Sequence, residues 1–495
     1  MARRLLLYLV YQSPFDHHSS MKRSRRIIGF LIILCGLTLN VGHGQEWWPR
    51  FRGPNGSGVA SDEANPPMTF GPEKNVQWKM TVPEGSSSPV IWGDHLYLTA
   101  FQDDRLKTLC YHREDGRKLW ERLAPTVKIQ AYFEKSGSPA ASSVATDNDR
   151  VVAYFGSFGV LCYDHQGNEL WKRRLEVPED PFSFGTGTSP ILAKGLVIVQ
   201  RDYEPTQSHL LALDAKTGET RWQTARAGYP TSYGTPMVWR HDDKAELIVT
   251  GSLRVCGYDL DKGQETWNAA GMCAFVCTSA VASSNNLFVA SWSTGSYGEP
   301  FPEFKVLASG DSDKDGKLTS AEFGRTIPGD FFVSFDQNSD GFLTKDEWDY
   351  VRDYASRGKN ALMAIRPGGS GDITDTHVEW KVEKGIPYVP SPLYYQGQVY
   401  VVKDGGLVSS VDAETGKPHY HRKRLGAGGD YYASPIAAGG RVYLASLNGE
   451  IVVIEAGPEL KILASNDFEE RLSATPAIVG DTLYLRTAKH LYALR

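Results

Sequence analysis

The sequence lacks an excess of basic residues, and this limits the partners that the protein can bind. It has 53 Lys and Arg residues against 58 Asp and Glu residues, so its formal net charge is −5. Removal of residues 1–44, the leader predicted below, takes away six basic residues and one acidic residue and leaves a net charge of −10. Because binding to a phosphate backbone requires a basic face, we expect no nucleic-acid partner.

Apolar runs long enough to cross a bilayer are also missing. The run IIGFLIILCGLTL at 27–39 has thirteen residues, which as a helix span about 20 Å, short of the roughly 30 Å hydrocarbon core. The basic stretch MKRSRR at 21–26 precedes this run, and small residues lead to Gly44. This order predicts a signal peptide cleaved near Gly44, with Met1 or Met21 as the start. We therefore expect a periplasmic or secreted protein with no transmembrane span in the mature chain; a membrane anchor is the alternative.

Cysteine is scarce, and its number is odd once the leader is removed. The five remaining cysteines are Cys110, Cys162, Cys256, Cys273 and Cys277. An odd number in an exported protein excludes a full disulfide framework. Cys273 and Cys277 would lie about 13 Å apart on an extended strand, beyond the roughly 7 Å Cα limit for a disulfide. Only a turn between them would permit a bridge. The G-x-S-x-G, H-E-x-x-H and P-loop motifs are missing as well.

An internal repeat of about 45 residues fills most of the chain. Each unit starts at a Ser or Thr, often followed by Pro, and continues through apolar strands to a TG-type turn and a final strand with Trp. Four short strands in about 45 residues are the size of one propeller blade. The eight entry residues are Ser88, Ser143, Ser189, Thr235, Ser279, Ser391, Ser434 and Thr475. They predict an all-β protein, an eight-bladed β-propeller with four-stranded antiparallel blades.

The closure of this ring is predicted from its last unit, which stops after three strands. Five blades end at Trp120, Trp171, Trp222, Trp267 and Trp380, and Tyr420 takes the place of Trp in the sixth. The missing fourth strand of the last blade is NVQWKM, with Trp78. Closure by an N-terminal strand leaves no free sheet edge. We expect a leader at 1–44, an extension at 45–75 and the propeller at 76–495.

The pattern resembles the quinoprotein (PQQ-binding-like) eight-bladed propeller family over roughly residues 76–495. The D-x-x-TG-x-x-x-W turns carry the resemblance, most clearly in LDAKTGETRW. The stretch WPRFRGPNGSG at 48–58 resembles the opening of exported bacterial proteins of this type. For dehydrogenases of this architecture the resemblance implies PQQ over the ring centre, with calcium, a catalytic aspartate and usually two adjacent cysteines. This sequence has no Cys-Cys dipeptide and no C-x-x-C-H haem site.

Two acidic loops of twelve residues interrupt the fifth repeat, DSDKDGKLTSAE at 311–322 and DQNSDGFLTKDE at 336–347. Both follow the EF-hand scheme, in which positions 1, 3, 5, 7, 9 and 12 supply oxygen ligands and Gly occupies position 6. The predicted ligands are Asp311, Asp313, Asp315, the Lys317 carbonyl, Thr319 and Glu322 in the first loop, and Asp336, Asn338, Asp340, the Phe342 carbonyl, Thr344 and Glu347 in the second. Because clustered hard oxygens repel one another without a cation, the loops predict two calcium ions.

The position of these loops follows from the spacing of the entry residues. The interval from Thr235 to Ser279 is 44 residues, whereas that from Ser279 to Ser391 is 112. The excess falls between the second and third strands of blade five, so an EF-hand pair at 294–359 is inserted in that turn. In an up-and-down blade this b–c turn lies on the same face as the loop that enters the first strand. We name this the entry face and expect the EF-hand pair to stand on it.

Aromatic and basic residues recur at the same positions of several blades on the entry face. They are Tyr233, Tyr388, Tyr431, Trp292, Arg201, Lys403 and Arg486. They predict an anion- or sugar-binding funnel; the alternative is that they pack the funnel and pair with neighbouring acidic residues.

Two functions remain open. The first is a non-catalytic, exported, calcium-binding scaffold, similar to the outer-membrane assembly scaffolds, that presents its entry face to a protein or glycan. The second is a PQQ-dependent, quinoprotein-type oxidoreductase. The missing cysteine pair and haem site favour the first.

Overall fold

The structure is a computed structural model that describes residues 47–133, 137–177, 184–203, 207–228, 231–296, 300–327, 332, 335–336, 338 and 340–495. The predicted leader and its cleavage point at Gly44 lie outside the described residues. Among the helices that are described, none combines the length and the apolar character needed to cross a bilayer.

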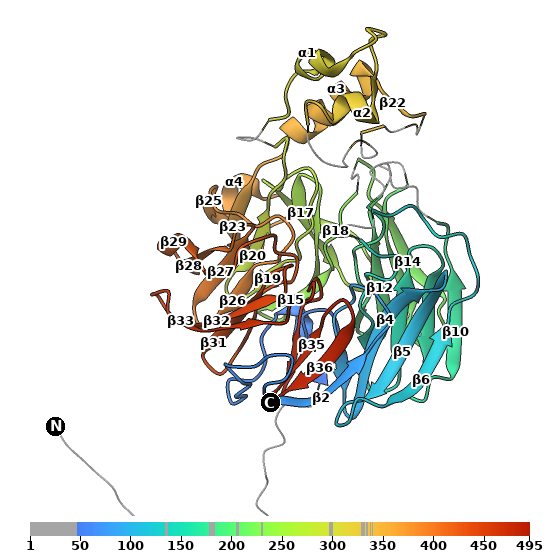
Figure 1. Cartoon of the computed structure of the whole chain (residues 1–495), viewed down its shortest axis with the longest axis vertical. Helices are drawn as coiled ribbons and strands as arrows, with labels where there is room; N and C mark the ends of the chain where they lie inside the picture. Colours follow the sequence, from blue (N-terminus) through green and yellow to red (C-terminus); the bar gives the residue numbers. More distant parts are fainter. Residues whose placement is uncertain are drawn as a thin grey trace, which may run out of the picture. The chain divides into compact units, whose positions relative to one another are not determined.

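Eight sheets follow one another along the chain and form the blades of a propeller, each built on four antiparallel strands, with a fifth strand added in blades one and four (Figure 1). Blades one to four consist of β3 (Val90–Trp92), β4 (His95–Gln102), β5 (Arg105–His112) and β6 (Lys118–Leu123); β7 (Ala145–Thr146), β8 (Val151–Phe155), β9 (Gly159–Tyr163) and β10 (Glu169–Arg174); β11 (Ile191–Ala193), β12 (Leu196–Arg201), β13 (His209–Asp214) and β14 (Thr220–Ala225); and β15 (Met237–His241), β16 (Lys244–Gly251), β17 (Arg254–Asp259) and β18 (Glu265–Ala270). Blades five to eight consist of β19 (Val281–Ala282), β20 (Leu287–Ser291), β23 (Ala361–Ile365) and β25 (Val378–Val382); β26 (Leu393–Tyr395), β27 (Gln398–Lys403), β28 (Leu407–Asp412) and β29 (Pro418–Arg424); β30 (Ile436–Ala438), β31 (Arg441–Ala445), β32 (Glu450–Glu455) and β33 (Ile462–Asp467); and β34 (Ala477–Val479), β35 (Thr482–Arg486), β36 (His490–Leu494) and β2 (Val76–Thr81). The predicted eight-bladed propeller is confirmed.

The last blade is closed by the N-terminal strand, as predicted. In its sheet, β2 pairs antiparallel with β36, and Trp78 lies opposite Ala493. The two ends of the propeller therefore share one sheet, in which β2 is the outer strand and covers the edge of β36.

The entry residues join neighbouring blades through a closed ring of hydrogen bonds. The backbone N–H of each entry Ser or Thr donates to the side-chain hydroxyl of the entry residue in the next blade, at 2.8–3.0 Å. The series begins at Ser88, which donates to Ser143, and it ends at Thr475, which donates back to Ser88. A hydroxyl is required at each position because it satisfies a buried N–H of the preceding blade. This requirement explains why every repeat starts with Ser or Thr.

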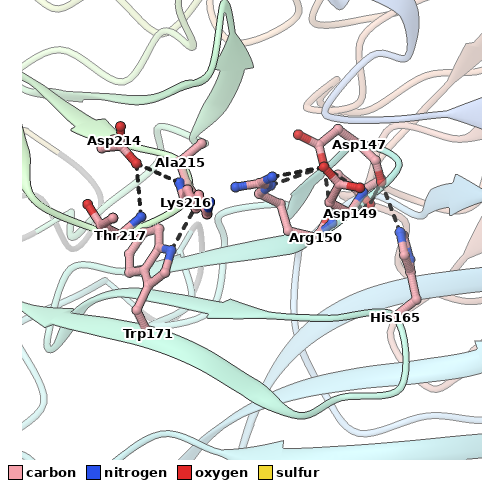
Figure 2. Close-up of polar contacts among 10 residues, drawn as sticks. Asp147, Asp149, Arg150, His165, Trp171, Asp214, Ala215, Lys216 and Thr217 are labelled. Atoms are coloured by element: carbon pink, nitrogen blue, oxygen red, sulfur yellow. Dashed lines mark hydrogen bonds and ion pairs between the residues drawn. The ribbon is translucent and has the colours of Figure 1, made fainter.

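The closing tryptophans join blades on the outer side of the sheets. Trp171 donates from Nε1 to the carbonyl of Ala215 in the next blade at 3.0 Å, and the carboxylate of Asp214 accepts the N–H groups that shape that turn (Figure 2). Gly218 in the same turn has φ 74°, and a Cβ there would lie 2.6 Å from the Trp171 ring. The TG-type turn thus needs glycine both for its backbone and to admit the indole. The same bond to a carbonyl of the next blade is made by Trp78, Trp120, Trp222 and Trp380.

The N-terminal extension contributes to the interior of the ring. Its strand β1 (Trp47–Trp48) pairs with β3 as a fifth strand, and it is followed by the short helix η1 (Pro54–Gly56). The carbonyl of Pro49 accepts from Thr146 of blade two at 2.8 Å, and Ala60 donates to Ala437 of blade seven at 2.9 Å. The extension therefore contacts the first strands of several blades, which surround the axis of a propeller.

The interruption of blade five contains most of the helices in the described part of the chain. Between β20 and β23 lie α1 (Phe304–Leu307), η2 (Ala308–Gly310), β21 (Leu318–Thr319), α2 (Ser320–Phe323), β22 (Phe342–Leu343) and α3 (Lys345–Ser356). Between β23 and β25 lie β24 (Gly371–Asp372), which pairs parallel with β18, and α4 (Thr374–His377). We name the described residues from 300 to 356 the inserted lobe.

Candidate functional site

The two acidic loops lie side by side in the inserted lobe. Strands β21 and β22 pair antiparallel and set Leu318 opposite Leu343 and Thr319 opposite Phe342. Both leucines are fully buried. Leu318 and Leu343, each two residues after the glycine of its loop, thus pair in a short two-stranded sheet that joins the two candidate metal sites.

The first loop gathers three carboxylates around one point. Ligand oxygens of Asp311, Asp313 and Asp315 all lie within 4.8 Å of one another. Gly316 has φ 82° and donates its N–H to Asp311 at 3.0 Å. The turn at glycine allows the loop to fold back over its own first aspartate. Negative charges at this spacing repel one another, and a divalent cation with oxygen ligands would offset that repulsion.

Glu322, the last predicted ligand of this loop, is held at the start of α2. Its carboxylate accepts hydrogen bonds from the N–H and hydroxyl of Ser312 at 2.9 and 2.7 Å, and from those of Thr319 at 3.0 and 2.9 Å. These hydrogen bonds, with those from Ser312 the largest cause, lower the pKa of Glu322 to about 2. Glu322 is therefore ionised at neutral pH, as a calcium ligand must be.

The second loop repeats this geometry in the residues that the structure describes. Gly341 has φ 87° and donates to Asp336 at 2.9 Å, and Asp340 donates its N–H to Asn338 at 2.9 Å. Glu347 accepts from the hydroxyl of Thr344 at 2.7 Å at the start of α3. Thr319 with Glu322, and Thr344 with Glu347, form capping boxes, in which each side chain satisfies a free N–H of the other. The oxygen donors of both loops suit calcium.

An aromatic core fixes the lobe between the loops. Trp348 on α3 is fully buried and donates from Nε1 to the carbonyl of Pro302 at 2.9 Å. Its ring lies 5.3 Å from that of Phe301 and 5.0 Å from that of Phe335, the residue just before the second loop. Movement of either loop would therefore change the packing around Trp348.

The lobe contacts the ring through the end of α3. The hydroxyl of Tyr354 shares a hydrogen bond with that of Ser252, in the b–c turn of blade four, and its ring lies 6.3 Å from that of Phe275. After the helix, Lys359 donates its N–H to the carbonyl of Met272 at 2.9 Å. The lobe is therefore attached to a b–c turn and to the loop that enters blade five, both elements of the entry face.

Three of the predicted entry-face residues meet in one cluster. The rings of Trp292 and Tyr388 lie 5.7 Å apart in an edge-to-face arrangement, and Nζ of Lys403 lies 5.4 Å from the centre of the Trp292 ring. All three side chains are half-buried. Burial raises the pKa of the neighbouring Asp404, and it also raises that of Tyr432. We name these five residues the entry-face cluster.

The side chains of the other four predicted residues have other partners, although the backbone N–H of Tyr431 donates to Asp404 of the cluster at 2.9 Å. Tyr233 is half-buried beside Phe184, with the ring centres 6.2 Å apart. Arg201 is buried and donates to the carbonyl of Glu176. Tyr431 is fully buried, and its hydroxyl donates to the carbonyl of Ala427 at 2.9 Å.

Arg486 is also interior, since it is 1% exposed and donates to Ser87, Thr99 and Pro83. Its side chain and that of Tyr431 take no part in the surface proposed below.

The sequence interpretation missed Asp404 and Tyr432. Both were adjacent to residues that it selected, namely Lys403 and Tyr431. Consecutive residues of an extended segment point to opposite sides. The half-buried Tyr432 beside a fully buried Tyr431 shows which of the two faces outward.

Two features that the resemblance implies for a PQQ site, a cysteine pair and a cluster of metal-ligating side chains, are not found on the entry face among the described residues. Cys273 and Cys277 are free thiols and form no disulfide with each other. In the part of the chain that the structure describes, the one group of three metal-ligating side chains is Asp311, Asp313 and Asp315 in the inserted lobe. We therefore derive no oxidation chemistry for this face.

Comparison with known proteins gives one family. The family described as "Outer membrane protein assembly factor BamB" matches residues 109–274 and 372–495, which flank the inserted lobe and make up more than half of the chain. A search of curated proteins found no match.

Solved propellers share the fold at low sequence identity. BamB from Moraxella catarrhalis aligns with a TM-score of 0.52 at 12% identity and covers 84% of this chain and 98% of its own. A europium-containing methanol dehydrogenase aligns with a TM-score of 0.55 at 11% identity and covers 90% of this chain and 98% of its own. A quinohemoprotein alcohol dehydrogenase from Comamonas testosteroni aligns with a TM-score of 0.53 at 12% identity and covers 90% of this chain and 80% of its own. At these identities the likeness shows the fold alone.

Proposed function

The chain belongs to the family described as outer membrane protein assembly factor BamB, and on this premise we propose that it is an exported, calcium-binding scaffold that binds another protein with its entry face. The predicted signal peptide supports export to the periplasm or beyond, in a bacterial cell. A glycan is the alternative ligand, and the experiment below separates the two.

The observation that carries this proposal is the entry-face cluster. Trp292 and Tyr388 present half-buried aromatic surface, and Lys403 sets a positive charge against the Trp292 ring. Partly buried aromatic residues beside a basic residue are typical of the positions that dominate protein–protein binding energy. Asp404 adds a carboxylate whose burial raises its pKa, a feature enriched at functional sites.

Calcium bound in the lobe would affect the entry face through the loop that enters blade five. The lobe holds the loop at Phe275 through Tyr354, and Cys277 follows two residues later in the same loop. The pKa values of Tyr388 and Tyr432 are both raised, chiefly by burial and in part by the nearby Cys277. The loop that contacts the lobe therefore also borders the cluster. Calcium binding would order the lobe and, through this loop, the ligand surface.

Photo-crosslinking in cells tests the proposal directly. Lys403 is replaced by p-benzoylphenylalanine, and a matched variant carries the same residue at Leu170, which is 50% exposed on the outer strand of blade two. We expect a light-dependent adduct from position 403 that is weakened by a calcium chelator, and none from position 170. An adduct removed by protease supports a protein ligand, whereas one removed only by glycosidases identifies a glycan.

Two outcomes count against the scaffold. Equal adducts at positions 403 and 170, or none at position 403, would show that the cluster is not a ligand surface. Retention of added PQQ after gel filtration in calcium, seen as its absorption band, would favour the oxidoreductase.

A further inference from the structure

Two buried arginines lie in the N-terminal extension where it passes the first strands of the blades. Arg50 is 7% exposed and Arg52 is 0% exposed. Arg50 donates from one terminal nitrogen to the carbonyl of Pro236 in blade four at 3.0 Å. Arg52 donates to the carbonyl of Pro392 in blade six at 2.6 Å. Each guanidinium thus reaches toward the axis-facing start of a blade.

Glycines make room for these side chains. A Cβ at Gly56 would lie 2.7 Å from a terminal nitrogen of Arg50, and one at Gly58 would lie 3.1 Å from a terminal nitrogen of Arg52. Both glycines have positive φ, 69° and 76°. The segment RGPNGSG therefore folds so that two guanidinium groups fit inside the ring.

The two guanidiniums have more donors than the protein satisfies. Nε of Arg50, and both Nε and one terminal nitrogen of Arg52, are shielded from solvent and have no hydrogen-bond partner in the described part of the chain. No ion pair to either arginine is found among the residues that the structure describes. A buried donor without a partner, and above all a buried charge without one, destabilises a fold.

The two charges also act on each other. Burial lowers the pKa of Arg50 to about 10 and that of Arg52 to about 9, and for Arg52 the charge of Arg50 adds to the effect. At neutral pH both groups still carry their protons. The protein therefore holds two neighbouring positive charges in its interior.

Three further arginines are buried in the described part of the chain, and one of them shows how a carboxylate can compensate such a charge. Arg226 is 2% exposed, and its guanidinium pairs with the buried carboxylate of Asp202 at 2.7 Å. No carboxylate takes this role for Arg50 and Arg52 in the described part of the chain. We propose that a small inorganic anion, a halide or an oxyanion, binds between Arg50 and Arg52 and accepts from their free N–H groups.

A bromide experiment on the whole mature protein tests this site. Crystals grown in sodium gluconate and soaked in sodium bromide should show an anomalous peak within about 3.5 Å of Nε of Arg52. In solution, bromide is titrated against gluconate at constant ionic strength while Tm is recorded. Above Kd, we expect Tm to rise by about 1–2 °C for each tenfold increase in bromide. Parallel titrations with nitrate and phosphate decide between halides and oxyanions.

Two variants separate the site from a general salt effect. Arg52→Gln should lose the response of Tm to the anion. Arg441→Gln should keep it, since Arg441 contacts the same extension at Pro66, at 2.8 Å, but lies at the other end of that segment. If Arg52→Gln does not fold, the wild-type peak and titration still decide the question. The proposal would be overturned if water or a carboxylate of the protein occupied the position beside Nε of Arg52 and if Tm did not depend on which anion is added.

Discussion

The substitution Glu322→Gln tests the candidate calcium centre most directly. Glu322 is the last ligand of the first loop, and its carboxylate accepts four hydrogen bonds from Ser312 and Thr319, two at each oxygen. An amide keeps only one oxygen and therefore loses two of these bonds and the negative charge. The bidentate ligand that position 12 supplies to calcium is lost with them.

The expected magnitude follows from the two loops. Calorimetry should find two calcium ions bound to the wild type and one to Glu322→Gln, with the second loop still occupied. At a calcium concentration one hundred times Kd, each site stabilises the folded protein by about 2.7 kcal/mol, so the variant should lose about that amount in the calcium-dependent part of its stability. The sequence has 12 tryptophans, so the part of the fluorescence change that a Trp348→Phe variant loses is assigned to Trp348, which packs against Phe335 beside the second loop and reports the same event inside the lobe.

A matched control lies in the same lobe. Glu303→Gln removes an exposed carboxylate that pairs with Lys305 and has no place in either loop, so it should leave the calcium stoichiometry at two. If Glu322→Gln still binds two ions, or if the wild type binds none, the assignment of these loops as calcium sites is refuted.

Three further predictions concern the lobe and the ring. The backbone N–H of Ser293 donates to the side chain of Asn360 across the base of the insertion at 2.9 Å. Replacement of 294–359 by a short Gly-Ser link should therefore leave the β-sheet circular dichroism and a cooperative thermal transition intact. Loss of that transition would show that the lobe holds the ring together. Gly218→Ala should destabilise the ring by at least about 1 kcal/mol more than Gly195→Ala in urea unfolding. Both glycines have φ near 73°, but only a Cβ at 218 would meet the Trp171 ring, whereas nothing lies within 4 Å of a Cβ at 195. Equal unfolding midpoints for the two variants would contradict this packing. The pKa of Glu322 is lowered from 4.5 to about 2. Its hydrogen bonds should therefore stabilise the lobe fully above about pH 4.5 and lose that effect as the pH falls toward 2. A fluorescence change of Trp348 that occurs only near neutral pH would refute the role of this carboxylate.

Much of the fold could be predicted because its signals are local and repeated. Eight Ser or Thr entries along the chain predict eight blades, and each of those residues makes the same hydrogen bond to the next blade. The orphan strand around Trp78 predicts closure for the same reason, since a unit with three strands needs a fourth. The ligand spacing of the two acidic loops is likewise contained within twelve residues, and the structure gathers Asp311, Asp313 and Asp315 as that spacing requires.

The number of blades, their closure and the acidic loops could thus be predicted from the sequence, because each has a local or repeated signal, although the closing strand itself pairs with β36 at the other end of the chain. Which side chains face outward, in contrast, became clear only from the folded chain. Tyr432 rather than Tyr431 joins Trp292 and Lys403, and Arg486 is buried among carbonyls, because these choices depend on contacts between blades far apart in sequence. The same holds for Arg50 and Arg52: the stretch at 48–58 was matched only by its resemblance to exported proteins, and the folded chain shows that both arginines are buried inside the ring, where their two charges are held close together.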